Sequence, residues 1–418
     1  MAEIPTNDIF DVIIIGAGIM GSCAAYEVAK LNKKVLLLEQ FDLLHFLGSS
    51  HGESRTIRAT YPEPYYPPMV IESAVLWEAA QSAAGYRVLT PTTQLDLGPS
   101  HCLSLQSAIR NCSPDSLPAT IYDSNPTEIT GAFHLPDGWI ALSTPLGGII
   151  KPTKAVAMFQ SLALRLGTVI RDRAVVDAID RIADVGIRVS TTDGRIFHGA
   201  KVVVTAGAWT HKLVKMVTGR DLPIQPLHTL IWYWKIKDGF ESEMSPAAGF
   251  PTFASYGLPY VYGTPAMEFP GLIKVALHAG WPCDPDSRDW TMDGDGMVGR
   301  VAEWIERLMP GRIETASGPV IKQTCMYSMT PDEDFVIDFL GGEFGKDVVV
   351  AGGFSGHGFK MGPLVGKMVA EMVIDGEVRT AARIGLDMRV FGLGRFEGGK
   401  QGNAKDFGEQ VESHVGQS

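Results

Sequence analysis

One cysteine stands directly before a Pro-Asp turn and a short apolar strand, in the stretch QTCMYSMTPDEDFVIDF. This residue, Cys325, could fill a core, bind a metal, attack a substrate or hold another group covalently. The chain has 5 cysteines, at Cys23, Cys102, Cys112, Cys283 and Cys325. Their scattered positions, without a C-x-x-C pair, disfavour a disulfide framework and a metal site. The sequence around Cys325 also lacks a cysteine–histidine signature, which disfavours thiolate catalysis, and a core position is the default for an isolated cysteine.

A glycine- and serine-rich stretch, GSSHGESRTIRATY, brings His51, Arg55 and Arg58 close together. An isolated pair of arginines is commonly a solvated surface charge. In an acidic chain, a loop arginine is better explained by a carboxylate partner, which the planar guanidinium can bind through two parallel hydrogen bonds. The stretch therefore predicts a carboxylate-binding site.

The segment GLIKVALH sets Lys274 and His278 four residues apart in an otherwise apolar run. In a strand, residues at even spacing face the same side, so these two side chains would share one face. A lysine there is costly unless it lines a cavity or meets an anion. The alternative is an edge strand whose polar face is wet.

A nucleotide-binding fingerprint lies near the start of the chain. Gly16, Gly18 and Gly21 form G-x-G-x-x-G between an apolar strand and a helix, and Glu39 ends the next strand. Such glycines let the backbone approach a pyrophosphate, while the carboxylate accepts hydrogen bonds from ribose hydroxyls. FAD and NAD both fit this pattern, and a glycine-rich turn without a ligand is the alternative. The N-terminal position, with the sheet completed by distant segments, favours a flavoprotein.

Several buried strands must position these residues. The apolar runs at 11–15 and 35–38 predict parallel strands covered on both faces, and a helix between them extends to about Leu31. KVVVTAGAW and DVVVAGGFSGHGF are two further strands that run into glycines. We therefore expect one nucleotide-binding domain assembled from separated segments. LIWYWKI and YVYGTPAMEFPGLIKVALHAGW predict antiparallel strands of a second domain, where a substrate cavity could lie.

The glycine-rich stretch at 352–362 precedes a helix with Pro363 in its first turn. The positive end of the helix dipole would stabilise a nearby negative charge, and Lys360 lies at its start. A reduced flavin ring would be such a charge.

Length and composition limit the function classes. A chain of 418 residues predicts two domains or one elaborated α/β unit. The net charge of -11 argues against nucleic-acid and anionic-membrane partners, and no apolar run is long enough for a membrane span. We expect an intracellular protein, cytoplasmic or peroxisomal. The expected ranges are 1–88, 144–213 and 319–394 for the FAD-binding domain, 89–143 and 214–318 for the substrate domain, and 395–418 for a polar tail.

Four stretches together resemble one known family. They are GAGIMG, SSHGESRTIR, CMYS followed by DEDFVID, and GFSGHGFK. From about Phe10 to about Arg395 the chain is similar to the monomeric sarcosine oxidase and L-pipecolate oxidase family, and most similar to its plant members. The resemblance implies an α/β (α+β) fold: a glutathione-reductase-like FAD-binding domain with a substrate domain built on an antiparallel sheet. It also implies a monomer.

The resemblance assigns roles to the candidate residues. Cys325 would carry FAD through an 8α-S-cysteinyl thioether, with Gly356 of the GFSGHGFK stretch beside the cofactor. Arg58 and Lys360 would hold a substrate carboxylate, and His278 would line the amine side.

Four further residues follow from the same matching. Lys274 would promote the reduction of O2, and Arg55 and His51 would lie close to the flavin ring. Tyr262 would line the amine side with His278. The interval between Tyr262 and Lys274 is one residue longer than in the bacterial enzymes, which makes Tyr260 an alternative.

The implied reaction is the oxidation of a small secondary α-amino acid, sarcosine or L-pipecolate, by O2 to an imine and H2O2. The TYPEPYYPPM loop departs from the bacterial pattern, which leaves the choice of substrate open. Two alternatives remain: a flavin amine dehydrogenase that uses another electron acceptor, and a non-catalytic FAD-binding protein. Oxygen uptake and bleaching of the flavin band by secondary amines would distinguish them.

Overall fold

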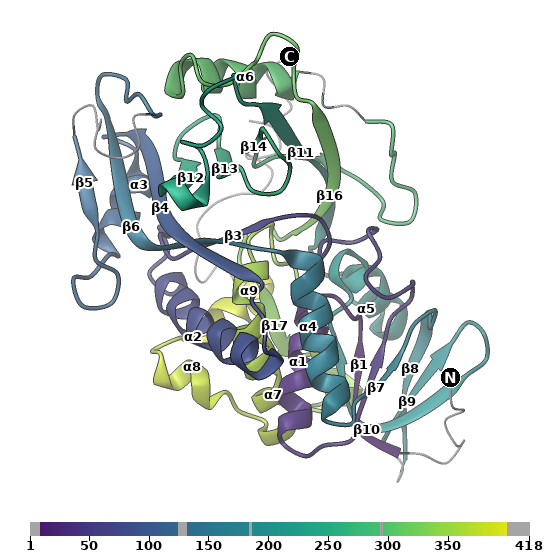
Figure 1. Ribbon diagram of the computed structural model, residues 1–418. Coiled ribbons are helices and arrows are strands. Elements are labelled where there is room, and N and C mark those ends of the chain that lie inside the picture. The colour runs from purple at the N-terminus through teal and green to yellow at the C-terminus, as the bar shows by residue number, and fades with distance from the viewer. Residues whose placement is uncertain (1–8, 124–131, 184–185, 293, 295, 399–418) are drawn as a thin grey trace.

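The computed structural model describes residues 9–123, 132–183, 186–292, 294 and 296–398. Two β-sheets organise this part of the chain, one in each half of the molecule (Figure 1). Among the described residues, the helices are α1 (Ile19–Lys30), α2 (Tyr66–Ala84), α3 (Leu103–Arg110), α4 (Pro152–Arg165), α5 (Thr210–Thr218), α6 (Met297–Leu308), α7 (Gly362–Asp375), α8 (Arg379–Arg383) and α9 (Arg395–Gly398).

The first sheet contains the predicted nucleotide-binding strands. In the described chain its order is β17 (Val336–Phe339), β18 (Val348–Gly352), β10 (Ile196–Val204), β1 (Ile9–Ile15), β2 (Val35–Leu38) and β7 (Val169–Arg171), with β8 (Val176–Ile182) and β9 (Gly186–Thr191) joined through β10. The strands from β18 to β7 are parallel to one another. The three predicted strand-then-glycine elements, β18, β10 and β1, thus lie side by side.

Burial on both faces explains the continuous apolar runs of this sheet. Val12 and Ile14 of β1 belong to a core that includes α1, α4 and α7, whereas Ile13 and Ile15 belong to a second core on the opposite face. Alternate residues of a strand point to opposite faces, so a strand covered on both sides must be apolar throughout.

The second sheet is mostly antiparallel, as the tryptophan-rich segments predicted. In the described residues its order is β15 (Trp281–Pro282), β11 (Gln225–Lys235), β14 (Leu272–Leu277), β13 (Val261–Thr264), β12 (Thr252–Ser255), β4 (Leu89–Pro99), β6 (Trp139–Ile150) and β3 (Arg55–Arg58), with β16 (Ile321–Met329) paired to β11 and β5 (Thr120–Tyr122) paired to β6. Its core contains Trp232, Trp234 and Phe253, and Val301 and Trp304 of α6 pack against them.

Three segments differ from the expected domain ranges. β3, β16 and the part of β6 from 144 to 150 pair within the second sheet, although all three fall in ranges expected for the FAD-binding domain. The domain boundaries therefore stay a proposal. The tail prediction is wrong for its first residues, because Arg395–Gly398 form α9 and the Arg395 side chain is buried against Asp332. The rest of that predicted tail, 399–418, lies outside the described residues.

None of the described helices is both long and apolar enough to cross a bilayer.

Candidate active site

The turn from β1 into α1 forms a tight backbone cradle. Gly16 has a φ of +100°, and a Cβ added there would lie 2.5 Å from the carbonyl oxygen of Thr205. A Cβ on Gly21 would lie 1.9 Å from the carbonyl oxygen of Gly16. Any side chain at either position would therefore collide with backbone, which explains two of the three glycines of the fingerprint. The third, Gly18, faces the hydroxyl of Ser50, which also accepts a hydrogen bond from the backbone N–H of Ile19 at 3.1 Å.

Glu39 ends β2 beside this turn. Its Oε2 accepts a hydrogen bond from the N–H of Ala17 at 2.8 Å, and its Oε1 accepts one from the N–H of Phe41 at 3.1 Å. His45 Nε2 lies 3.4 Å from the same Oε1. These contacts hold the carboxylate at the edge of the cradle, as the fingerprint predicts for a group that meets a ribose.

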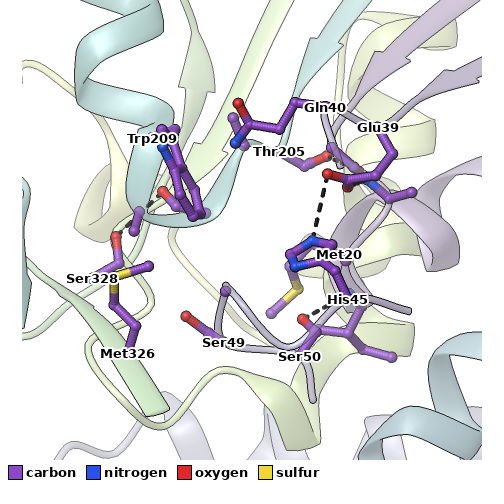
Figure 2. A pocket seen from close by; sticks show the side chains of 18 of the residues that line it. Met20, Glu39, Gln40, His45, Ser49, Ser50, Thr205, Trp209, Met326 and Ser328 are labelled. Carbon is purple, nitrogen blue, oxygen red and sulfur yellow. Dashed lines mark hydrogen bonds and ion pairs between the residues drawn. The ribbon is translucent and has the colours of Figure 1, made fainter. Parts of the chain in front are cut away.

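An elongated cavity of about 370 Å³ begins at this cradle. Figure 2 shows Glu39 and His45 on one side of it, and Trp209, Met326 and Ser328 on the other. The cavity ends at Cys325 and Tyr327, which belong to β16 of the second sheet. Its glycine cradle and its carboxylate fit a dinucleotide cofactor such as FAD.

A second cavity, of about 200 Å³, adjoins the first. The two cavities share five lining residues, which are Arg55, Cys325, Tyr327, Gly356 and Phe359. Gly356 has a φ of +75°, and a Cβ there would lie 2.8 Å from the Tyr327 ring, so glycine keeps this junction open. A cofactor in the first cavity would thus present one end to a ligand in the second.

Cys325 is buried at the junction. Its Sγ accepts a hydrogen bond from Arg55 Nη2 at 3.2 Å, and its carbonyl oxygen accepts one from Arg288 Nη1 at 3.2 Å. Arg55 also donates to the carbonyl oxygens of Ser49 and His51, at 3.0 and 2.8 Å.

His51 lies behind Arg55 and does not line either cavity. Burial and, secondarily, the charges of Arg55 and Arg288 lower its pKa to about 3, which keeps the imidazole neutral. Its Nε2 has no hydrogen-bond partner among the described residues. The prediction that His51 lies beside the cofactor stays a prediction.

Lys274 enters the second cavity from β14. Its side chain is 2 % exposed, and its Nζ donates to Ser54 Oγ at 3.2 Å and lies 5.3 Å from the centre of the Tyr262 ring. Burial and the nearby Arg55 lower the pKa of Lys274 from 10.5 to about 8. Of the two readings of this lysine, the structure favours the cavity-lining one over a wet edge strand, because β14 is buried along its length.

Two further cations lie at another part of the same cavity. Lys360 Nζ donates to the hydroxyl of Tyr61 and to the carbonyl of His357, both at 2.8 Å. The guanidinium group of Arg58 lies over the ring of the same tyrosine, with its central carbon 4.9 Å from the Tyr61 ring centre. Burial and the charge of Arg58 lower the pKa of Lys360 well below its usual value. Lys360 is buried and Arg58 is partly buried. An anion bound beside both would favour the protonated form of Lys360, as a carboxylate clamp requires.

Aromatic side chains form the remaining wall. The His278 and Tyr327 rings are 5.2 Å apart, and the hydroxyls of Tyr262 and Tyr327 are 3.4 Å apart. Tyr260 also lines the cavity, so both candidate tyrosines reach it. The choice between the two tyrosines stays open.

The structure brings most predicted site residues to these two cavities. Gly16, Gly18, Glu39, Arg55, Cys325 and Gly356 line the first, and Arg55, Arg58, Tyr262, Lys274, His278, Cys325, Gly356 and Lys360 line the second. Gly21 shapes the turn without lining the cavity. Sequence reasoning gave no role to Tyr61, Tyr256 or Tyr327. Tyr327 was within reach, because it stands two residues after Cys325 on one strand and so shares its face.

A family model described as "FAD dependent oxidoreductase" matches residues 11–372. The chain is 55 % identical to "Probable sarcosine oxidase" of Arabidopsis thaliana over 407 residues, which cover 96 % of each protein. It is 36 % identical to "Peroxisomal sarcosine oxidase" of Homo sapiens, over 88 % of this chain and 92 % of that protein.

The chain belongs to the sarcosine oxidase family of FAD-dependent oxidoreductases. This confirms the predicted family and the prediction that FAD is the cofactor. Two solved structures have the same fold. NikD, "an unusual amino acid oxidase", has a TM-score of 0.77 and 21 % identity, over 92 % of this chain and 98 % of that one. L-proline dehydrogenase from P. horikoshii has a TM-score of 0.76 and 24 % identity, over 94 % and 99 % of the two chains. The predicted fold class is thus confirmed.

Proposed function

We propose that this flavoenzyme oxidises small secondary α-amino acids, sarcosine or L-pipecolate, with O2 as the electron acceptor. The products are an imine and H2O2, and water hydrolyses the imine of sarcosine to glycine and formaldehyde. The observation that carries this proposal is the meeting of the two cavities at Cys325, with buried cations in the smaller one. The names of the relatives from Arabidopsis thaliana and Homo sapiens support the substrate class.

In this proposal Arg58 and Lys360 bind the substrate carboxylate. Lys360 is buried and Arg58 is partly buried, so little water competes for the carboxylate oxygens and the interaction is strong. A carboxylate fixed there orients the amine toward the wall formed by His278 and Tyr262 and toward the junction of the cavities. Fixing the substrate in this way replaces a bimolecular encounter with an oriented reaction.

FAD, when bound, supplies the redox chemistry, taking up two electrons from the substrate and passing them to O2. Lys274 acts in the second of these events. Its ammonium group, held by Ser54 over the Tyr262 ring, stabilises the negative charge that develops on O2. This preorganised cation favours an oxidase over a dehydrogenase that uses another acceptor.

Cys325 is the proposed covalent anchor of FAD, through an 8α-S-cysteinyl thioether. Its buried sulfur, its place in both cavities and its hydrogen bond from Arg55 support this role. Acid precipitation of the purified protein tests it. A yellow pellet is expected for the native chain and a colourless one for Cys325→Ser, whereas flavin released from the native chain into the supernatant would contradict the bond.

Anaerobic titration of the purified holoenzyme tests the function itself. Sarcosine, L-pipecolate and L-proline are added in turn while the visible flavin band is followed, and at least one is expected to bleach it. Admission of air, without any artificial acceptor, should restore the band and produce H2O2. If none of the amino acids bleaches the flavin, the proposal fails and a non-catalytic FAD-binding protein becomes the better explanation.

The names of the relatives suggest the compartment and the oligomeric state of the protein. The human and mouse relatives are named peroxisomal, and several bacterial ones are named monomeric. We therefore propose an intracellular monomer, cytoplasmic or peroxisomal.

A further inference from the structure

A buried carboxylate, Asp96, lies behind the proposed carboxylate clamp. It belongs to β4 and is 0 % exposed, and it does not line the substrate cavity. Ionised carboxylates are rarely buried without a compensating role, because removing the charge from water is costly. None of the roles proposed above uses this residue.

Asp96 is connected to Arg58 through Thr60. The hydroxyl of Thr60 donates to Asp96 Oδ2, and the carbonyl oxygen of Thr60 accepts a hydrogen bond from Arg58 Nη1. Tyr256 completes the link, because its hydroxyl lies 3.3 Å from both the Thr60 carbonyl oxygen and Arg58 Nη1. Gln94 Nε2 donates to the other oxygen of Asp96 at 3.0 Å. Residues from β4, from the segment after β3 and from the segment after β12 thus converge on one guanidinium.

The contacts leave Arg58 fixed but not neutralised at short range. The partners described above for Arg58 are neutral oxygen atoms, and Asp96 acts on it from one residue further away. Burial opposes the charge of Arg58, but Tyr256, Asp96 and Tyr61 raise the pKa of the guanidinium above its usual value. Burial raises the pKa of Asp96, while Arg58 and the donors Thr60 and Gln94 favour its ionised form.

We propose that Asp96 is a positioning and charge-balancing residue for Arg58 that moderates the affinity of the substrate cavity for carboxylates. This inference rests on the proposed function of Arg58 as part of the clamp. Without Asp96, Arg58 would lose the carboxylate that Thr60 links to it, although Glu63 and Glu333 would still line the cavity. Such a site would hold a substrate or product carboxylate more tightly, and tight binding of the ground state does not accelerate the reaction.

An Asp96→Asn variant removes the charge and can keep the hydrogen bonds. The new amide oxygen can accept from Gln94 Nε2, and the new amide N–H can donate to Thr60 Oγ1, since a hydroxyl both accepts and donates. Thr60 then still presents its carbonyl to Arg58. Charge and position are thereby separated in one substitution.

Acetate and acetamide have nearly the same shape, so the difference between their Kd values measures how much the ligand's charge contributes to binding. Each is titrated into the oxidised holoenzyme, and its Kd is read from the perturbation of the visible flavin band at constant ionic strength. Asp96→Asn is expected to bind acetate about five- to tenfold more tightly, as loss of a neighbouring charge in a buried site requires, with acetamide changed by less than about twofold. Asp115→Asn, which removes an exposed carboxylate, is the matched control and should leave both Kd values unchanged.

Three results would count against the inference. Parallel weakening of acetate and acetamide would show that Asp96 only shapes the site. An unchanged acetate Kd would show that its charge is not felt. If Asp96→Asn did not fold, Asp96→Ser would be measured in the same way, and failure of both would make Asp96 a folding residue. The clamp has a separate test: if acetate neither perturbs the native flavin nor competes with substrate, the proposed function of Arg58 fails first.

Discussion

At the scale of single residues, Lys274 is a buried ammonium group with a proposed role in O2 reduction. Its ammonium group is buried beside Arg55, and these surroundings bring its pKa to about 8. The nearby Glu268 counteracts part of this effect. A charge kept in a site that disfavours it is most strongly stabilised when an anion forms next to it, which is the situation expected during O2 reduction.

A Lys274→Met substitution should therefore separate the two half-reactions. Substrate-driven flavin reduction should remain within a few-fold of the native rate, because the proposed clamp is untouched. Re-oxidation by O2 should slow by about 100-fold or more, which is typical for loss of one preorganised charge. Stopped-flow absorbance measures both steps, with the exposed Lys235→Met as the control. Equal losses in both steps would contradict the assigned role.

The same residue predicts a pH dependence. A lysine with a pKa of about 8 is protonated below that pH and neutral above it. The rate constant for re-oxidation should thus be highest at low pH and fall as pH rises through about 8. In Lys274→Met this decline should be absent. A native profile that stays flat from pH 7 to 10 would refute the ionisation argument.

At the scale of elements, the turn between β1 and α1 makes the cofactor site depend on a missing side chain. The backbone oxygen of Gly16 lies where a Cβ on Gly21 would have to be, 1.9 Å away, and Thr205 Oγ1 would lie 2.6 Å from it. Both obstacles belong to the cradle itself, so relief of the clash must distort it.

Gly21→Ala is accordingly expected to abolish FAD retention during purification, read as the ratio of absorbance at the flavin band to that at 280 nm. Gly299→Ala is the matched control. Gly299 lies in α6, and a Cβ there would meet no heavy atom within 4 Å. Because alanine is the better helix former, this control should hold FAD normally and gain up to about 1 kcal/mol of stability. A fully yellow Gly21→Ala protein would show that the cradle adapts.

The helices and strands also show which parts of the structure could be predicted from the sequence. The strand β2 (Val35–Leu38) was predicted with its bounds, and α7 begins at the glycine before Pro363, because local signals determine both. The Asp96–Thr60–Tyr256 network was not predicted. It joins residues 36 and 196 positions apart, and no local pattern signals such a contact. His278 lies one residue beyond the end of β14, so it is not part of the strand as predicted, although it lines the same cavity as Lys274.

At the scale of the whole molecule, the chain folds back on itself at its last described helix. Arg395 of α9 pairs with Asp332 at 2.8 Å and also donates to the carbonyl oxygen of Asp334 at 3.0 Å. Both partners of the ion pair are almost completely buried, with side-chain exposures of 0 % and 1 %. The polar, glycine-rich composition after 394 suggested a tail, since composition alone does not reveal one buried partner far away in the sequence.

Removing this arginine should weaken the fold. Arg395→Met leaves Asp332 buried without its counter-charge, which typically costs about 3–5 kcal/mol. Denaturant unfolding of the holoprotein, followed by flavin and tryptophan fluorescence, measures the loss. Arg389→Met removes the exposed pair with Asp387 and should cost less than about 1 kcal/mol. Similar costs for the two variants would contradict the structural role of Arg395.

The pairing of β16 with β11 has one more consequence. This strand carries Cys325 as part of the second sheet, while the glycine cradle belongs to the first. A prosthetic group bonded to that sulfur and bound by the glycine cradle at its other end would cross-link the two halves of the protein. Its insertion would then complete the folding of the enzyme as well as supply its redox chemistry. The protein without FAD should therefore unfold at a lower temperature than the protein that contains it.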